Sequence, residues 1–242
     1  MKSSSTLAKT PKTKALYPDI FPKDVVAFTN DRKVNFAFPE HSDSLSASQL
    51  ESLEAHLGFS PKIVNIRQVH GNRIVVAHEG ADVSEQADGL ITNAKNIAIV
   101  VRTADCFPIF IFDPKKHAIG LVHAGWKGTH KHILSEAIKA MKREYGSQPS
   151  NLKLAFGPAI RACCYEVAEN FLAEFPMETF ERKNHCYLDM ALANTNQALE
   201  AGVPEEQIFD CGICTFCDKN YFSYRREKEK AGRMLSLMLL RG

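Results

Sequence analysis

Three short apolar runs lie close together in the middle of the chain, at residues 97–101, 108–112 and 118–122, and turn residues separate them. Continuous apolar runs of roughly four to eight residues are typical of strands that are buried on both faces of a sheet. The sequence therefore predicts a group of buried central strands. Cys106 and His123 lie at the ends of these strands, where a rigid scaffold would hold a side chain beside a cleft.

Further strands are predicted on both sides of this centre, at residues 25–30, 34–38 and 152–156. Residues 62–69 and 73–77 flank the tripeptide His70-Gly71-Asn72. Its last two residues tolerate a positive φ, so a hairpin is expected there. The apolar segment 234–240 is expected to dock as a final strand or helix.

Helices are predicted where a capping residue precedes apolar positions at helical spacing. Residues 46–49, Ser-Ala-Ser-Gln, form a capping-box pattern, and Gly58 is a suitable end for the helix that follows. Another short helix is expected at residues 166–175, and Asp189 is expected to cap a helix that ends near Gly202. Thr129 is expected to cap a helix whose apolar face consists of Ile133, Leu134, Ala137, Ile138 and Met141.

Composition narrows the classes of protein that fit this pattern. The chain has 242 residues, 45% of them hydrophobic, so we expect one mixed α/β domain over residues 16–242 after a mobile, Ser/Thr/Lys-rich tail at residues 1–15. The net charge of +2 argues against a nucleic-acid or membrane-surface partner. We see no apolar run of the roughly 18 residues that a membrane span needs, and no secretory signal. Seven cysteines cannot all pair and no secretory signal is seen, so we expect reduced thiols and a cytoplasmic protein. A monomer is expected as well.

The strongest candidates for chemistry are His70, Cys106 and His123, each at the end of a predicted strand. Two imidazoles and a thiolate could bind zinc and leave a fourth position open, as in catalytic zinc sites. The same residues could form a metal-free Cys–His dyad, or could be structural side chains. Asp88 and Asp105 could orient a histidine, or could be turn carboxylates.

Two groups of basic residues are candidates for binding an anion. Residues 120–129 resemble a phosphate-binding loop, but Trp126 stands where that loop requires lysine. Lys127 and the following helix start could bind phosphate, or the glycines could simply permit a tight turn. Arg225, Arg226 and Arg233 follow the aromatic run at residues 221–224, and their forked side chains suit phosphate or carboxylate, although a structural role is the alternative.

The remaining cysteines give a weaker signal. Cys211, Cys214 and Cys217 form two overlapping C-x-x-C units, but the ferredoxin pattern would need a fourth cysteine where Tyr221 stands. A four-ligand zinc site would need a distant partner. We therefore expect these cysteines, like the adjacent Cys163 and Cys164, to be structural thiols.

Several motifs taken together resemble one known family. They are RQVHGNRIV, ADGLIT, RTADCFPIFIFD, GLVHAGWKGT, FGPAIRACCYEV, CTFCDKNYFSYRRE and AGR, in this order between about residues 68 and 233. The chain resembles the YfiH-type laccase-domain proteins. The resemblance implies an α/β/β/α sandwich of the YfiH and cytotoxic-necrotizing-factor type. It also implies a metal site of His70, Cys106 and His123 that holds zinc, or alternatively copper.

The resemblance further implies an activity. Members of the family have been described as polyphenol oxidase, as peptidoglycan-editing factor, and as purine nucleoside phosphorylase with adenosine deaminase and methylthioadenosine phosphorylase activity. We expect the purine activity, with a purine nucleoside and phosphate as substrates. Candidate substrate-binding residues are Asn35, Asp105, Lys127 and Arg225. The alternatives are a copper polyphenol oxidase, a metal-free Cys–His hydrolase of a cell-wall precursor, and a non-catalytic binding protein.

One segment departs from the family pattern. The family has a Thr-Arg-x-Gly-Gly loop before a Leu-Asn-Leu-Gly strand, whereas residues 28–36 are shorter and contain no glycine. Asn35 aligns with the family asparagine, and Arg32 is displaced from the position of the arginine. The wall of the nucleoside pocket is therefore the part of the site in which this chain is expected to differ from its relatives.

Overall fold

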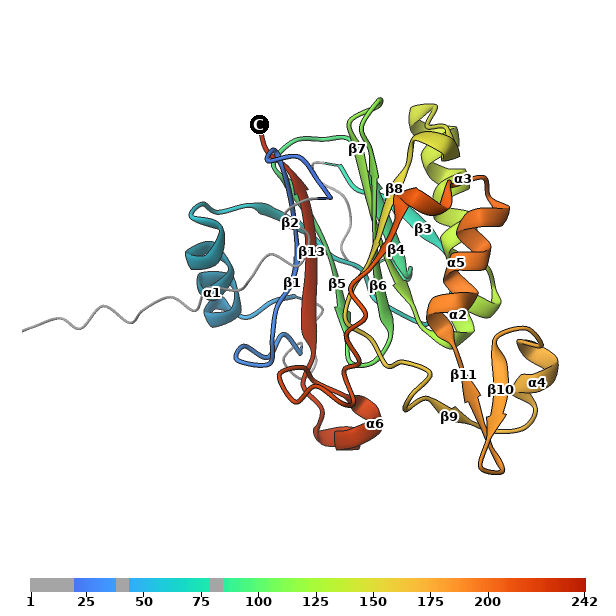
Figure 1. The fold of residues 1–242 in the computed structure, drawn as a ribbon. Coiled ribbons are helices and arrows are strands. Elements are labelled where there is room, and N and C mark those ends of the chain that lie inside the picture. Colours follow the sequence, from blue (N-terminus) through green and yellow to red (C-terminus); the bar gives the residue numbers. More distant parts are fainter. Residues whose placement is uncertain (1–19, 38–43, 79–84) are drawn as a thin grey trace, which may run out of the picture.

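Two β-sheets lie face to face in the middle of the molecule (Figure 1). The structure is a computed structural model, and it describes residues 20–37, 44–78 and 85–242, so the tail expected at residues 1–15 lies outside it. The first sheet has the order β1 (Val25–Thr29), β13 (Met234–Leu240), β5 (Ile97–Thr103), β2 (Lys62–Val64). The second has the order β12 (Ile208–Asp210), β8 (Lys153–Phe156), β6 (Phe107–Asp113), β7 (Ala118–Ala124), β4 (Gly89–Thr92), β3 (Ile74–Val76).

Helices cover the outer face of each sheet. Helix α1 (Ala47–Leu57) packs on the first sheet. The second sheet is covered by α2 (Trp126–His130), α3 (Ile133–Tyr145) and α5 (Met190–Glu200). The layers therefore follow the order α/β/β/α, and the predicted sandwich is confirmed. A small third sheet of β10 (Thr179–Arg182), β11 (His185–Leu188) and β9 (Glu166–Val167) lies beside α4 (Phe171–Glu174), while α6 (Tyr224–Glu227) precedes β13. Short 3₁₀ turns occur at Pro149–Asn151, Glu205–Gln207 and Lys228–Lys230.

Alternation along the central strands explains why they are apolar throughout. In β6, Ile109 and Ile111 pack towards α3, whereas Phe110 and Phe112 pack between the two sheets. In β13, alternate leucines pack towards α1, and Met238 faces the second sheet. Successive strand residues point to opposite faces, so a strand between two apolar layers needs apolar residues at every position. The predicted central strands are confirmed, and segment 234–240 is a strand.

The predicted ends of two helices are confirmed. Ser46 and Gln49 form both hydrogen bonds of a capping box at the start of α1, and Gly58 ends this helix with φ 78°. Asp189 accepts a hydrogen bond from the backbone N–H of Leu192 at the start of α5. The predicted apolar face of α3 is also confirmed, because its five residues are all buried.

Four local predictions are wrong. Strands β2 and β3 belong to different sheets and form no hairpin, and the positive φ of 58° falls on His70. Thr129 does not cap α3, because it is buried inside α2. Residues 166–167 pair with β11, so only the end of segment 166–175 is helical. Residues 34–37 form no strand, and residue 38 lies outside the described residues.

None of the helices in the described part of the chain has the length and apolar character needed to cross a membrane.

Candidate metal centre and its cavity

Strand pairing brings His70, Cys106 and His123 together. Cys106 directly precedes β6, and His123 lies near the end of β7, which runs antiparallel to β6 with His123 opposite Pro108. The loop between β2 and β3 brings His70 to the same place, where its ring centroid lies 4.8 Å from that of His123. One ligand atom from each of the three side chains lies within 4.8 Å of the others. The three predicted residues therefore form a group that could hold a metal ion.

Asp88 fixes two of the three side chains. It is fully buried, and its Oδ1 accepts hydrogen bonds from His123 Nδ1 at 2.8 Å and from the backbone N–H of His70 at 2.9 Å. Its Oδ2 accepts from the backbone N–H groups of Val69 at 3.2 Å and Gly71 at 2.6 Å. These bonds stabilise the positive φ of His70 and leave Nε2 of His123 facing the site. The expected orienting role of Asp88 is therefore visible in its contacts.

Two glycines are required for this close packing. A Cβ atom on Gly125 would lie 3.0 Å from Cys106 Sγ and 3.0 Å from His70 Cδ2. A Cβ atom on Gly128 would lie 2.7 Å from the carbonyl oxygen of Gly71, which could not move away without disturbing the His70 loop. The glycines of the segment that resembles a phosphate-binding loop thus permit a tight strand-to-helix turn, one of the two roles considered for them.

The protonation states of Cys106 and His123 support each other. Burial alone would raise the pKa of Cys106, but the charge of His123 and hydrogen bonds from His123 and His70 lower it to about 6. Burial alone would lower the pKa of His123, but the charge of Cys106 and the hydrogen bond to Asp88 raise it to about 9. In the absence of a metal ion, a thiolate and an imidazolium therefore coexist at neutral pH.

A cavity of about 510 Å³ opens beside the three residues. Arg102, Arg225 and Arg233 line it, together with Trp126, Tyr165 and Tyr224. Arg225 is held in place by a hydrogen bond from its Nη1 to the carbonyl oxygen of Glu166 at 2.8 Å, and its guanidinium lies 5.3 Å from the centre of the Tyr165 ring. The cavity thus combines cationic and aromatic side chains next to the candidate metal ligands.

Asp105 lines the cavity but directs its carboxylate into the protein. Its Oδ1 accepts a hydrogen bond from Thr215 Oγ1 at 2.6 Å, and its Oδ2 accepts from Ser223 Oγ at 3.1 Å and from the backbone N–H of Arg225 at 2.6 Å. The residue has a positive φ of 87°. Asp105 therefore positions the segment that carries Arg225, and its predicted contact with the substrate stays a prediction.

The other two predicted substrate-binding residues are not among those that line this cavity. Lys127 is exposed, with its Nζ 5.5 Å from the centre of the Trp126 ring. Asn35 Oδ1 accepts the backbone N–H of Arg233 at 2.8 Å, so it positions the segment of an arginine that does line the cavity. Sequence reasoning missed Arg102 and Tyr165, although both lie inside the motifs that carry the family resemblance. Arg102 lies in the same motif as Cys106, and Tyr165 directly follows Cys164.

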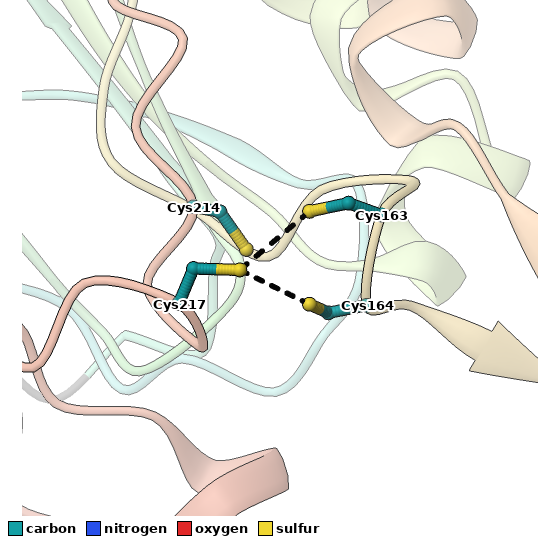
Figure 2. A group of neighbouring side chains, drawn as sticks. All are labelled: Cys163, Cys164, Cys214 and Cys217. Atoms are coloured by element: carbon teal, nitrogen blue, oxygen red, sulfur yellow. Dashed lines mark hydrogen bonds between the residues drawn. The ribbon is translucent and has the colours of Figure 1, made fainter.

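A second group of sulfur atoms lies on the neighbouring loops. Cys163 and Cys164 meet Cys214 and Cys217, and the four sulfurs lie within 4.8 Å of one another (Figure 2). The adjacent pair thus supplies the distant partner that the C-x-x-C segment lacked in the sequence.

Fold and site together define a four-layer α/β protein with a His/Cys group suited to a metal ion beside an arginine-lined cavity. The chain belongs to the family described as multi-copper polyphenol oxidoreductase laccase, whose model matches residues 33–241. A purine nucleoside phosphorylase of Clostridium acetobutylicum is 35% identical over 180 residues, which are 72% of this chain and 75% of the relative. The purine nucleoside phosphorylase YlmD of Bacillus subtilis is 33% identical over 189 residues, which are 71% of this chain and 68% of the relative.

Solved structures show the same fold. The crystal structure of YlmD from Geobacillus stearothermophilus superposes with a TM-score of 0.84 at 27% identity and covers 91% of this chain and 93% of the other. The hypothetical protein YfiH of Bacillus licheniformis gives a TM-score of 0.80 at 26% identity, with 90% and 93% covered.

Proposed function

We propose that this protein is a metal-dependent purine nucleoside phosphorylase that cleaves the N-glycosidic bond of adenosine, inosine, guanosine or methylthioadenosine with phosphate. The observation that carries the proposal is the convergence of Arg102, Arg225 and Arg233 on a cavity next to His70, Cys106 and His123. A phosphorylase needs an anion site beside the bond that it cleaves, and arginine is well suited to phosphate oxygens. The names of the relatives support the same activity.

The arginines are held in a way that suits phosphate. The backbone N–H of Arg225 donates to Asp105, and the backbone N–H of Arg233 donates to Asn35. One polar side chain therefore fixes the backbone of each arginine. Arg233 also donates from Nη1 to the carbonyl oxygen of Ala231 at 2.7 Å. Each guanidinium has five N–H donors, so donors remain for an anion after these contacts are made. Positioning of this kind reduces the entropy lost when the anion binds.

The aromatic part of the cavity suits a purine. A volume of about 510 Å³ lies within the range of small-molecule sites, roughly 300–1,000 Å³. Trp126 and Tyr224 offer ring surfaces for a flat base. Burial and the negative charges of Cys106 and Asp105 raise the pKa of Tyr165, so its hydroxyl stays protonated at neutral pH and can donate a hydrogen bond.

The residues present fit a zinc ion. Two histidines and one cysteine are a usual set of zinc ligands, and Asp88 orients His123 as a carboxylate does in many zinc sites. A bound zinc ion would supply a Lewis acid to this end of the cavity. The same chemistry supports a second activity, adenosine deamination, in which water attacks the amino-bearing carbon of the adenine ring and ammonia leaves, while the glycosidic bond stays intact. Copper is the alternative metal, because imidazole and thiolate also bind copper.

A direct test is to incubate the purified, metal-quantified protein with inosine and with adenosine, with and without phosphate, and to separate the products by chromatography. Release of free base only in the presence of phosphate is the expected result. Conversion of adenosine to inosine would identify the second activity. A parallel incubation with a phenol tests the polyphenol oxidase, which would oxidise the phenol without turning over a nucleoside. Turnover of neither the nucleosides nor the phenol would favour the hydrolase or the binding protein.

Variants test the roles of the arginines. Arg225→Gln is expected to raise the KM for phosphate by roughly 10- to 100-fold, since a charge-assisted hydrogen bond contributes about 1.5–3 kcal/mol. Arg143→Gln is the matched control, because this exposed arginine on α3 pairs with Glu144 and does not line the cavity. Lys127→Gln tests the remaining sequence prediction, and an unchanged KM for phosphate would show that prediction to be wrong.

A further inference from the structure

The four cysteines of the second group come from two loops that are far apart in the sequence. Cys163 and Cys164 follow β8, whereas Cys214 and Cys217 follow β12, and β8 and β12 are parallel neighbours in the second sheet. The chain thus leaves two adjacent strands at the same edge, and the two loops meet there (Figure 2). None of the four forms a disulfide, and none lines the arginine-lined cavity.

The distances between the sulfur atoms match one metal ion. Cys217 Sγ lies 3.8 Å from Cys163 Sγ and 3.3 Å from Cys164 Sγ. Zinc binds thiolates at about 2.3 Å in tetrahedral geometry, which places the sulfurs about 3.8 Å apart. A disulfide would need about 2.0 Å, and an iron–sulfur cluster would hold the thiolates further apart, because iron and sulfide ions stand between them. We propose that Cys163, Cys164, Cys214 and Cys217 bind a structural zinc ion.

Contacts around the two loops hold the cysteines in place. Arg161 forms an ion pair with Asp210 through both of its terminal nitrogens, and its Nε donates to the carbonyl oxygen of Ile213 at 3.3 Å. The backbone N–H of Thr215 donates to the carbonyl oxygen of Ala159 at 3.0 Å. Arg182 Nη2 donates to the carbonyl oxygen of Cys163 at 2.9 Å. The loops therefore have partners of their own on both sides of the sulfur group.

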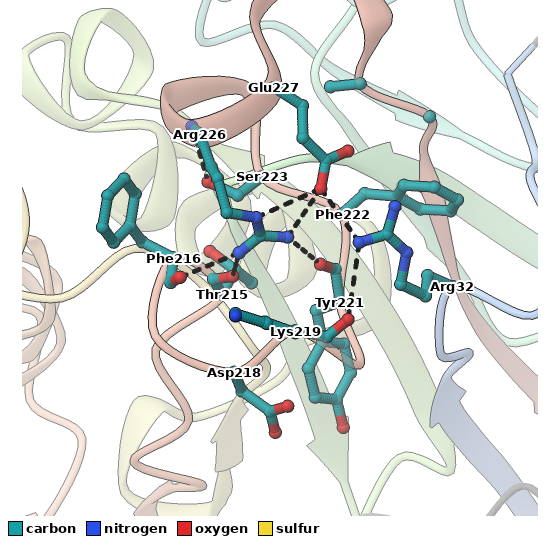
Figure 3. A network of polar contacts seen from close by, with 12 residues as sticks. Arg32, Thr215, Phe216, Asp218, Lys219, Tyr221, Phe222, Ser223, Arg226 and Glu227 are labelled. Atoms are coloured by element: carbon teal, nitrogen blue, oxygen red, sulfur yellow. Dashed lines mark hydrogen bonds and ion pairs between the residues drawn. The ribbon is translucent and has the colours of Figure 1, made fainter.

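Arg226 fixes the far side of the same loop (Figure 3). Its Nη1 donates to the carbonyl oxygens of Thr215 at 2.6 Å and Phe216 at 2.8 Å, and its Nη2 donates to that of Tyr221 at 2.6 Å. Glu227 accepts from the same guanidinium and from Arg32. These hydrogen bonds from Arg226 therefore help to hold in place the turn that carries Cys214 and Cys217.

The environment of Cys214 resembles that of a zinc-bound cysteine. Backbone N–H groups of Cys217, Arg161 and Phe216 donate to its sulfur. Two of these donors lie two and three residues after the cysteine, so the C-x-x-C turn itself satisfies the thiolate. Four thiolates repel one another at these distances, so a bound cation would stabilise the arrangement.

The position of the four-cysteine group beside the cavity gives the proposed zinc ion a structural role. Thr215 lies between Cys214 and Cys217, and its hydroxyl bonds to Asp105, which adjoins Cys106 and holds the backbone of Arg225. An ion that joins the two loops would therefore keep one wall of the cavity in place. This inference does not depend on the reaction that the cavity carries out.

The test uses the full chain, purified under reducing conditions and loaded with zinc alone, and counts the bound ions by native mass spectrometry. The wild-type protein is expected to hold about two zinc ions per chain, one in each group. Cys217→Ser and Cys163→Ser are expected to hold about one. Cys211→Ser is the matched control, because Cys211 belongs to the same segment but not to the sulfur group, and it is expected to keep both ions.

Alkylation of the wild-type protein gives a second readout that does not depend on the variants folding. Zinc is expected to protect all four cysteines from iodoacetamide, as read by peptide mass spectrometry, and a strong chelator is expected to expose them. The proposal is overturned if the wild-type protein holds a single ion while these thiols remain reactive, if Cys217→Ser and Cys163→Ser retain both ions, or if the reduced protein purified without metal contains a Cys164–Cys217 disulfide that zinc does not prevent.

Discussion

Replacing Asp88 by asparagine should damage the metal centre even though it keeps the size of the side chain. Each carboxylate oxygen of Asp88 accepts two hydrogen bonds, and the side chain is fully buried. An asparagine can match two of the four donors with its oxygen, but its NH₂ group then faces the other two. Two N–H groups would lose their acceptor, and the donors from residues 69–71 are partly buried.

The size of the effect follows from these contacts. A buried donor without a partner costs about 1–3 kcal/mol, so two of them cost about 2–6 kcal/mol. A domain is usually stable by only about 5–15 kcal/mol. The metal-free Asp88→Asn variant is therefore expected to unfold at a clearly lower urea concentration. Its affinity for zinc at His70, Cys106 and His123 is expected to fall by roughly 10- to 100-fold, as for other residues that orient metal ligands.

Asp113→Asn provides the matched control. Asp113 is also fully buried, but its Oδ1 alone accepts both hydrogen bonds, from the backbone N–H groups of Lys115 and Lys116. An asparagine can keep both with its oxygen, so a loss of only about 1 kcal/mol and unchanged zinc binding are expected. Urea unfolding of the metal-free proteins and zinc competition with a chromogenic chelator measure the two effects. Equal stability and equal zinc affinity in the two variants would refute the role given to Asp88.

Three further predictions test other parts of the structure. Gly125→Ala should weaken zinc binding at least about 10-fold in the same chelator assay, because the new Cβ atom would lie only 3.0 Å from Cys106 Sγ and from His70 Cδ2. An unchanged affinity for zinc would contradict this packing. In the metal-free protein, the pKa of Cys106 is lowered to about 6, so alkylation of this thiol should rise with pH around 6 and level off by neutral pH; a midpoint near the ordinary value would contradict the ion pair with His123. Leu154→Ala should cost about 2–5 kcal/mol in urea unfolding, because this side chain is fully buried between β8 and α3, whereas exposed Leu192→Ala should cost far less.

The parts of the fold that could be predicted are those in which local pattern and tertiary environment agree. Strands β6 and β7 are apolar throughout, and the capping residues Ser46 and Asp189 start their helices as expected. The hairpin at His70 failed because a turn sequence does not tell which strand its neighbours pair with. There, a long-range contact to Asp88 decides the conformation. Its buried carboxylate accepts hydrogen bonds from the backbone N–H groups of Val69, His70 and Gly71, and the positive φ falls on His70 although glycine adopts such a φ at a lower cost.

The site was predictable only in part, for a related reason. Residues at strand ends could be recognised as candidate ligands, but their approach depends on the register between β6 and β7 and on the loop before β3. Lys127 lies between Trp126 and Gly128 in a glycine-rich segment and resembles a phosphate ligand in the sequence, yet the first turn of α2 places it over Trp126, and it is not among the residues that line the cavity. The four-cysteine group could not be predicted, because its two halves are about 50 residues apart and meet only in the fold, through the parallel pairing of β8 with β12 and the contacts of the loops that follow them.

Asp105 connects the two sites, and the strengths of its contacts indicate what holds the cavity wall. Moving Thr215 away would leave a buried carboxylate oxygen without its donor, at a cost of about 1–3 kcal/mol. The ion pair between Arg32 and Glu227 of α6 is partly exposed, and pairs of this kind contribute only about 0–1 kcal/mol. The position of the loop therefore depends on the buried hydroxyl of Thr215, on the hydrogen bonds from Arg226 and on the sulfur group. Because the backbone N–H of Arg225 shares the same carboxylate, a loop displaced at Cys214 would displace an arginine of the cavity as well.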